Sequence, residues 1–291
     1  MEIIFEPSTL IIAGGALALW LFLKLGALAL GTRVFLYWRK EGKLLQTNPT
    51  HLSPTPGVFA NRLRFQLCRL LVFLKVGKLT VLGRENLNPQ ERYLIVANHR
   101  YQHDAVTLPA ALGTLPMRGL MSQTELTDFR APLAALAGVI AVHQDSHKTA
   151  SLRLSIRALT EEPNMSLVVF PQGRLVRDGD LKREQLQDGV ALVLKKVNQN
   201  GAAAKPVYLL PVCISYQFQS TGPQSLQERL LYGWKRQWFG ITTYGAVVSI
   251  GKPVLPDSYE REAVTEIIFN SITAQCRLLE NLDEASKTME V

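Results

Sequence analysis

A histidine and an aspartate, His99 and Asp104, lie five positions apart directly after the apolar residues 93–96. An apolar, β-branched run of this length is typical of a buried strand, so His99 follows a strand end and Asp104 lies about one helical turn further on. A carboxylate bonded to one ring nitrogen fixes the tautomer and raises the basicity of the other, which is the chemistry of a general base for a hydroxyl. The same two side chains also fit local backbone capping, and the pair alone does not separate these interpretations.

Several short blocks, in a fixed order along the chain, resemble the glycerolipid acyltransferase family of the 1-acylglycerol-3-phosphate and lysophospholipid type. They are residues 81–87 leading into Asn98-His99-x4-Asp104, residues 125–142, residues 168–174 with Leu186 and Gly189 after them, residues 210–214, and residues 251–254. The resemblance covers residues 80–255, and the order and spacing of the blocks are more specific than any one block. It implies that His99 is the catalytic base and Asp104 its partner, although His103, beside Asp104, is a rival base from its position.

The third block, Phe170-Pro171-Gln172-Gly173-Arg174, is similar to the family's Phe-Pro-Glu-Gly-Thr-Arg. The resemblance implies that these five residues bind substrate. Backbone groups near Gly173 and the Arg174 side chain are expected to hold an anionic part of a substrate or the developing oxyanion.

This chain departs from the family pattern at two places. Gln172 stands where the family has a glutamate, with Arg174 directly after Gly173, and residues 143–145 read His-Gln-Asp where the family usually has an arginine. The resemblance associates these positions with the glycerol-phosphate part of the acceptor. Loss of an arginine removes a bidentate phosphate ligand, and an amide in place of a carboxylate removes a charge. The sequence therefore indicates the type of reaction more strongly than the identity of the acyl acceptor.

The resemblance implies an O-acyltransferase that moves an acyl group from an acyl thioester, carried by acyl-carrier protein or acyl-coenzyme A, to a hydroxyl of a lysophosphatidate-like or other lipid acceptor. Neither a metal nor a bound cofactor is expected for this chemistry. Two alternatives stay open, which are a non-catalytic lipid-binding protein of the same fold and acylation of a phosphate-free lipid alcohol. A lipid hydrolase is disfavoured because the chain lacks a Gly-x-Ser-x-Gly motif.

The amino-terminal part of the chain has the composition of a membrane anchor. Residues 10–38 are almost entirely apolar, and a bilayer of about 30 Å needs on the order of 20 such residues, which this run supplies if Lys24 is tolerated at an interface. The acidic start of the chain is unlike the basic start of a signal peptide, so we expect a retained span or hairpin. We expect three parts: residues 1–53 as anchor and basic juxtamembrane segment, 54–80 as linker and interfacial amphipathic helix, and 81–291 as the acyltransferase domain with a C-terminal helix.

Positive charge gathers directly after this anchor. Residues 31–80 hold nine Lys or Arg and one acidic residue, in a chain of net charge +8. The positive-inside tendency then predicts a cytoplasmic catalytic domain, and anionic headgroups attract such a stretch. A second candidate for membrane contact is the Trp- and Arg-containing stretch 230–239, which equally fits the core of the domain. No nucleic-acid partner is expected because no binding motif accompanies the charge.

The pattern beyond residue 80 alternates between strands and helices. Strands are expected near residues 93–97, 139–142, 166–170 and 207–214, helices over 104–112, 151–159 and 189–197, and an amphipathic helix after residue 257. This alternation predicts an α/β fold with a mixed, largely parallel sheet flanked by helices, in addition to the N-terminal membrane-anchoring helical segment. Because ligands bind at the carboxyl ends of parallel strands, we expect His99, Gln172 and Arg174 to share one site.

The cysteines and two further histidines carry weaker signals. Cys68, Cys213 and Cys276 are scattered through apolar contexts without metal-ligand spacing, and we expect three buried thiols in a reducing compartment. His143 and His147 lie four apart, a spacing that can ligate zinc on a helix. The glutamate of the metalloprotease pattern is missing and the stretch follows a strand, so we expect no metal there.

Overall fold

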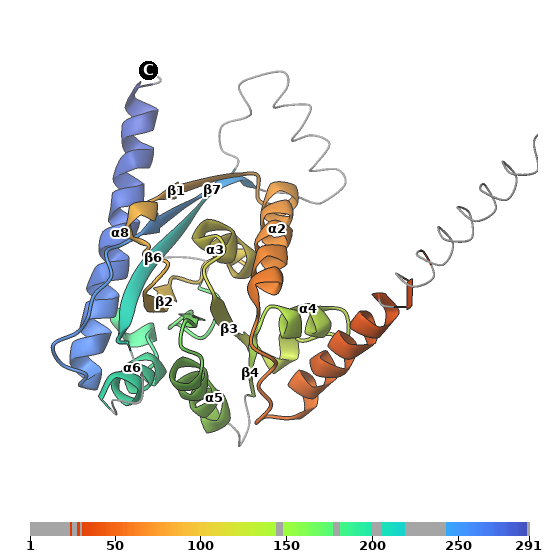
Figure 1. The fold of residues 1–291 in the computed structure, drawn as a ribbon. Coiled ribbons are helices and arrows are strands. Elements are labelled where there is room, and N and C mark those ends of the chain that lie inside the picture. The colour runs from red at the N-terminus through yellow and green to blue at the C-terminus, as the bar shows by residue number, and fades with distance from the viewer. Residues whose placement is uncertain are drawn as a thin grey trace, which may run out of the picture.

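The computed structural model describes residues 24, 28–29, 31–143, 148–176, 181–199, 205–218 and 243–289. A sheet of seven strands lies at its centre, in the order β1-β7-β6-β2-β5-β3-β4 (Figure 1). The strands are β1 (Lys78–Leu82), β2 (Arg92–Ala97), β3 (Met117–Ser122), β4 (Ile140–Val142), β5 (Ser166–Val169), β6 (Val207–Phe218) and β7 (Thr243–Ile250). Each of the four strands that the sequence predicts is present, within a few residues of its predicted limits. The sequence missed β1, β3 and β7.

Five of these strands run in one direction. β6, β2, β5, β3 and β4 pair in parallel, whereas β7 is antiparallel to β6 and β1 is parallel to β7. The prediction of a mixed, largely parallel sheet is therefore confirmed. The carboxyl ends of β2 and β5, which are neighbours, open at the same edge, and ligands of such sheets bind at that edge.

Helices cover both faces of the sheet. They are α2 (Val58–Lys75), α3 (Asp104–Leu112), α4 (Arg130–Leu136), α5 (Lys148–Glu161), α6 (Gly189–Gln199) and α8 (Arg261–Met289), with three short 3-10 turns at Arg84–Asn86, Gln123–Glu125 and Arg183–Gln185. Leu94 and Val96 of β2 pack in one core with α5, α6 and α8, whereas Tyr93 and Ile95 pack in a second core with α3. Because successive side chains of a strand point to opposite faces, β2 is apolar after Arg92, and all six of its residues are buried.

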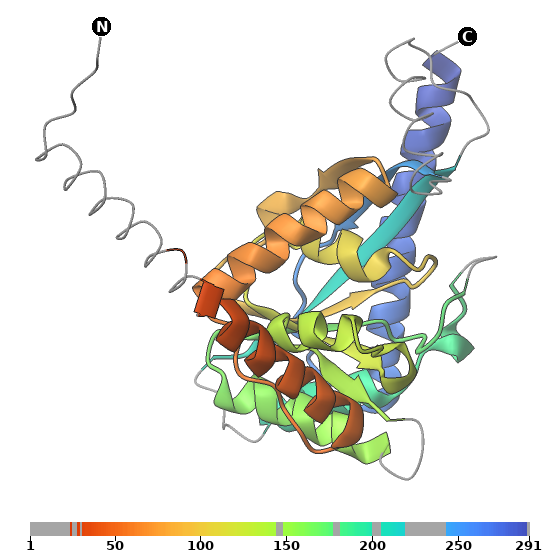
Figure 2. The same cartoon turned by 90° about the vertical axis from the view of Figure 1, so that its right-hand side faces the viewer.

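The helix α2 lies over α3 on the outer face of the domain (Figure 2). Its inward face carries Arg64, Cys68 and Val72, at the spacing of one helix face. The guanidinium of Arg64 donates to the carbonyl oxygens of Leu115 and Met117, at 2.8 and 2.9 Å, and burial lowers its pKa to about 10. The sequence counts Arg64 among the basic residues of a membrane-facing segment, but the structure places it inside, where it ties α2 to the start of β3.

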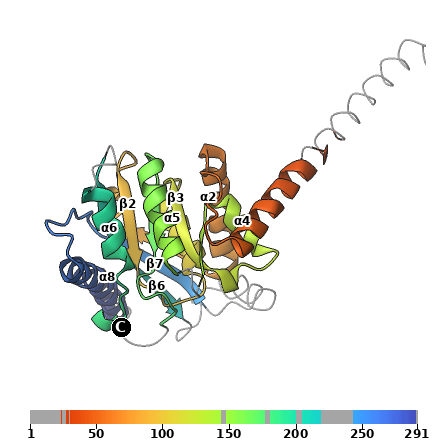
Figure 3. The same cartoon turned by 90° about the horizontal axis from the view of Figure 1, so that it is seen from below.

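Residues 31–47 form a helix that lies beside α4 in each view (Figure 3). Leu45 of this helix is fully buried in a small core with Ala131 and Ala135 of α4. Most of the predicted anchor precedes this helix and lies outside the described residues, as does the stretch 230–239. Within the described part of the chain, no helix combines the length and the apolar character that a membrane span requires.

The structure corrects the prediction for two of the three cysteines. Cys213 of β6 and Cys276 of α8 form a disulfide, with a Cα–Cα distance of 5.3 Å. These residues are 63 positions apart, so their proximity depends on α8 packing against β6 and is not visible in the cysteine spacing. Cys68 is a buried thiol, and burial raises its pKa to about 11. The inference of a reducing compartment therefore loses the support of Cys213 and Cys276.

Candidate active site

His99 and Asp104 meet at the carboxyl end of β2. β2 ends at Ala97, and α3 begins at Asp104, so the five-residue spacing folds into a tight connection. The Nδ1 atom of His99 lies 2.8 Å from Asp104 Oδ2. Because a carboxylate accepts the Nδ1 proton, Nε2 keeps its lone pair, and Nε2 has no hydrogen-bond partner among the described residues. The His99 side chain keeps 21% of its surface exposed, whereas that of Asp104 has none.

The Asp104 side chain is completely buried and is held by several donors. The backbone N–H groups of Arg100 and Tyr101 donate to Oδ2, at 2.8 and 3.0 Å. Backbone donors stabilise the ionised form of a buried carboxylate, which would otherwise take up a proton. The connection between β2 and α3 therefore holds a negative charge next to the imidazole.

Residues 170–176, which follow β5, form hydrogen bonds with both the N–H and the carbonyl group of His99. Gln172 Oε1 accepts a hydrogen bond from the His99 N–H at 2.7 Å, and the Val176 N–H donates to the His99 carbonyl at 2.8 Å. The ring of Phe170 stacks on the imidazole, with 4.3 Å between ring centroids and an interplanar angle of 18°. The first and third sequence blocks, 73 residues apart, thus form one site. The position of His99 depends on β2 and β5 pairing correctly.

A glycine is required within this segment. Gly173 has a φ of +64°, and a Cβ atom at this position would lie 2.1 Å from Gln187 Nε2. The Gln187 N–H donates to the Pro171 carbonyl at 2.8 Å, which brings residue 187 against this turn. The Gly173 N–H itself donates to the Phe170 carbonyl at 2.9 Å. The sequence suggested this region for an oxyanion, but the Gly173 N–H is already used within the turn.

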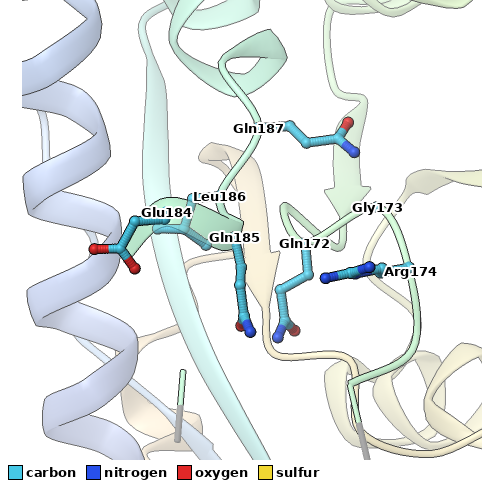
Figure 4. A pocket seen from close by; sticks show the side chains of 7 residues that line it. All are labelled: Gln172, Gly173, Arg174, Glu184, Gln185, Leu186 and Gln187. Atoms are coloured by element: carbon cyan, nitrogen blue, oxygen red, sulfur yellow. The ribbon is translucent and has the colours of Figure 1, made fainter. Parts of the chain in front are cut away.

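A pocket of about 360 Å³ opens beside this segment (Figure 4). Its lining residues are Gln172, Gly173, Arg174, Glu184, Gln185, Leu186 and Gln187. The Arg174 guanidinium is directed toward the Gln172 side chain, whereas the Glu184 carboxylate is directed toward α8. Because Gln172 Oε1 accepts from the His99 N–H, its Nε2 group has two donors to offer elsewhere. This pocket, which shares Gln172 with the His99 site, therefore presents a cation and an amide donor.

Two comparisons with known proteins bear on this site. Residues 78–215 match the family model named Acyltransferase. These residues are an acyltransferase-family domain. The crystal structure of the 1-acyl-sn-glycerophosphate (LPA) acyltransferase PlsC from Thermotoga maritima resembles the chain with a TM-score of 0.51 and 16% sequence identity, over 76% of this chain and 79% of that chain. No curated protein matches the sequence.

The match of residues 78–215 agrees with the acyltransferase family that the sequence blocks indicate. At 16% identity, the similarity to PlsC establishes a common fold. The matched residues of the acyltransferase domain include all of β1 to β5 and most of β6, so they contain both halves of the site around His99.

Other residues singled out in the sequence lie apart from the His99–Asp104 contact. The His103 ring packs edge-on against Tyr101, with 4.9 Å between centroids, and its pKa is lowered by burial and by Lys75, against the raising effect of Asp104. His143 is buried after β4, and His147 lies outside the described residues. Within the described ranges, no group of three or more His, Cys, Asp or Glu residues is arranged to hold a metal ion.

The side chains of Asn98 and Tyr216 make contacts at this site that the sequence did not predict. The Asn98 side chain donates to the Ile214 carbonyl at 2.9 Å and accepts from the Ile214 N–H at 2.7 Å, which joins the end of β2 to β6. Tyr216, two residues further along β6, contacts Asp104. The only sequence signal for Tyr216 is its place on the strand that pairs with β2, and that pairing is known only from the fold.

Proposed function

We propose that this protein is an O-acyltransferase in which His99 is the general base and Asp104 its partner. The observation that carries this proposal is the 2.8 Å contact between His99 Nδ1 and the buried carboxylate of Asp104, with Nε2 unbonded in a side chain that is 21% exposed. A base needs a lone pair, a fixed orientation and access to substrate, and this geometry supplies all three. The match of residues 78–215 to the acyltransferase model supports the reaction class.

In the proposed reaction, His99 Nε2 takes the proton of an acceptor hydroxyl as its oxygen attacks the carbonyl carbon of an acyl thioester. The Asp104 carboxylate stabilises the imidazolium that forms. The tetrahedral intermediate then breaks its carbon–sulfur bond, the thiolate leaves, and the imidazolium returns the proton to sulfur. The products are the acyl ester and the free thiol of the donor, which is either acyl-carrier protein or acyl-coenzyme A.

For the acceptor, we propose a lipid alcohol that bears a phosphate, such as a lysophosphatidate. Arg174 has no ion-pair partner among the described residues, and its guanidinium faces the amide of Gln172. A guanidinium binds phosphate through two parallel N–H groups, and an amide N–H₂ adds a further donor. Glutamine at position 172 places an amide and no negative charge beside Arg174, which is compatible with an anionic acceptor.

We propose that the domain works at the cytoplasmic surface of a membrane. The outer face of α2 exposes large apolar side chains together with the basic residues Arg62 and Arg69. These apolar residues include Val58, Phe59, Leu67, Leu70, Leu71 and Phe73, with Phe59 77% exposed. Apolar area beside basic side chains is the composition of a helix that binds anionic bilayers. Binding at the surface would bring a lipid acceptor to the adjoining domain.

The deciding experiment incubates the full-length protein in detergent with labelled acyl donor and a panel of acceptors. The donors are acyl-carrier protein and acyl-coenzyme A thioesters, and the acceptors are lysophosphatidate, neutral lysolipids and simple long-chain alcohols. His99→Ala is expected to reduce transfer by at least about 10³-fold, whereas His103→Gln, the matched control, keeps transfer within a few fold.

Each outcome of this panel has a distinct meaning. Transfer to lysophosphatidate that depends on His99 supports the full proposal. Transfer only to neutral alcohols contradicts the proposed role of Arg174 but keeps the reaction. Binding of lipid without transfer to any acceptor contradicts the enzyme proposal and favours a lipid-binding protein of the same fold.

A further inference from the structure

The hydroxyl group of Tyr216 lies between two side chains of α3. It is 2.7 Å from Asp104 Oδ1 and 3.1 Å from Thr107 Oγ1. An ionised carboxylate accepts hydrogen bonds but donates none, so the single phenol proton goes to Asp104. The Thr107 hydroxyl then acts as donor to the Tyr216 oxygen. A chain of hydrogen bonds therefore runs from Thr107 through Tyr216 to the carboxylate that faces His99.

The two oxygens of Asp104 are held by different parts of the fold. Oδ2 accepts from His99 Nδ1 and from the backbone N–H groups of Arg100 and Tyr101. Oδ1 accepts from Tyr216, which is its one side-chain donor among the described residues. Asp104 is 0% exposed, so water does not replace a missing donor at Oδ1. The β6 strand thus supplies a contact that the β2–α3 connection does not.

We propose that Tyr216 is a positioning residue of this site, whose hydroxyl fixes the Asp104 carboxylate and limits how strongly that carboxylate holds the imidazole proton. This inference rests on the proposed role of His99 and adds a third strand to the site. A donor on Oδ1 withdraws charge from the carboxylate, so the carboxylate stabilises the imidazolium less. Without that donor, more charge stays on Oδ2. The imidazolium is then favoured, and a larger fraction of His99 is protonated and inactive at a given pH.

Several other titratable groups are packed around this site. They are Tyr101, whose ring lies 4.9 Å from that of Tyr216, His103 on the same connection, and Lys75 and Cys68 of α2. Burial raises the pKa of the Cys68 thiol to about 11 and lowers the pKa of His103. Burial, and then the charge of Asp104, raises the pKa of Tyr216, so the phenol remains a donor. Lysine and tyrosine ordinarily titrate near pH 10, well above the working range of an imidazole base.

The test measures kcat/KM for acyl transfer between about pH 5 and 9 for the full-length protein and for Tyr216→Phe. The acid limb of the profile is expected to move upward by about one pH unit, which lowers activity up to about tenfold on that limb and leaves it unchanged near pH 9. The matched control is Tyr208→Phe, since Tyr208 lies on the same strand and the same face but away from Asp104. Its profile is expected to match that of the unaltered protein. A uniform loss across all pH values, an unchanged profile or a downward shift would overturn the inference.

A second measurement follows His99 without depending on activity. Carbon-13 labelling of the histidine ring gives five imidazole resonances, one for each histidine, and His99→Gln identifies the relevant one. The titration midpoint of this resonance is expected to rise in Tyr216→Phe. It should rise less in Thr107→Val, which removes only the donor to the Tyr216 oxygen. Unchanged midpoints in both variants would overturn the role of Tyr216, whereas absence of transfer by the unaltered protein would contradict the proposed function instead.

Discussion

Among the described residues, the Arg118–Glu162 and His99–Asp104 contacts each pair a basic side chain with a buried carboxylate, and they have different consequences. Arg118 of β3 is 0% exposed and bonds Glu162 through Nε and Nη2, at 2.9 and 2.7 Å, while its remaining N–H groups reach Ser53 and the Gly138 carbonyl. His99 bonds Asp104 through one nitrogen only. The guanidinium has used its donors, whereas the imidazole keeps an unoccupied nitrogen at the sheet edge. The Arg118–Glu162 pair is therefore structural, whereas the His99–Asp104 pair keeps one nitrogen that can form a hydrogen bond to a substrate.

The largest effect expected from this comparison is on activity. Asp104→Asn replaces an acceptor with an amide whose N–H₂ group faces the imidazole and favours the wrong tautomer. We expect kcat to fall by about 10³-fold or more, as for other histidine–aspartate pairs. Because the same N–H₂ group removes the acceptor of the Arg100 and Tyr101 N–H groups, the variant should also lose some stability, and kcat is therefore compared at a temperature where thermal unfolding shows both proteins folded. A kcat within threefold of normal would show that Asp104 is structural, like Glu162.

For the Arg118–Glu162 pair, we expect a large effect on stability and none on kcat. Glu162→Ala leaves the Arg118 guanidinium buried without its anion, and breaking such a pair costs about 3 to 5 kcal/mol of stability. Urea unfolding, followed by circular dichroism, measures the free energy of unfolding directly. The folded fraction should keep its kcat, since Glu162 does not contact His99. Loss of kcat without loss of stability would remove the distinction between the two pairs.

A smaller effect, on the KM for the acceptor, is expected from a substitution of Gln172 beside the His99–Asp104 pair. Gln172→Glu keeps an acceptor for the His99 N–H but removes the amide donors and adds negative charge beside Arg174. We expect the KM for a phosphate-bearing acceptor to rise about tenfold, which corresponds to one lost charge-assisted contact. The KM for a neutral alcohol should stay unchanged. Arg183→Gln is a suitable control, since Arg183 pairs with Glu266 on the surface. Equal changes for both kinds of acceptor would contradict the proposed anion site.

The smallest effect concerns the pH dependence of stability. Burial, followed by the charge of Lys75, lowers the pKa of His103 below its usual 6.5. Below about pH 6.5 the unfolded chain therefore binds this proton more readily than the folded protein, and the free energy of unfolding decreases as the pH falls. Above this range the neutral imidazole contributes its full stability. Urea unfolding from pH 5 to 8 should show a weaker pH dependence in His103→Gln than in the unaltered protein. An identical dependence in both proteins would contradict this assignment.

The sequence predicted those parts of the fold that depend on local pattern. The buried strand β2 and the helix α3 follow from an apolar run and from the composition after Asp104, and the order of short blocks identified the acyltransferase family. Strand β3 was missed because Met117, Arg118 and Gly119 are not typical strand residues. Arg118 is accommodated there by its pairing with Glu162 and by its hydrogen bonds to Ser53 and Gly138. The disulfide between Cys213 and Cys276 also depends on packing between distant segments.

In the candidate site, contacts between residues close in sequence could be predicted, whereas most contacts between distant segments could not. His99 and Asp104 are close in sequence, so their contact could be predicted from spacing and strand position. The expectation that Gln172 and Arg174 lie near His99 came from the rule that strand ends share one edge. The contact of Gln172 with the His99 N–H, the stacking of Phe170 and the role of Tyr216 required the strand order. Gly173 was assigned as a possible oxyanion donor because its N–H bond to Phe170 could not be foreseen.

The double hydrogen bond between Asn98 and Ile214 has a consequence for how the protein acquires activity. The two residues are 116 positions apart, and the residue after Asn98 is His99. Contacts of such long range form late, because the entropy of closing the intervening chain must be overcome first. A refolding chain with its local helices already formed would therefore still lack an organised base. Recovery of acyl transfer should follow the last long-range pairing step, which makes enzyme activity a reporter of complete folding.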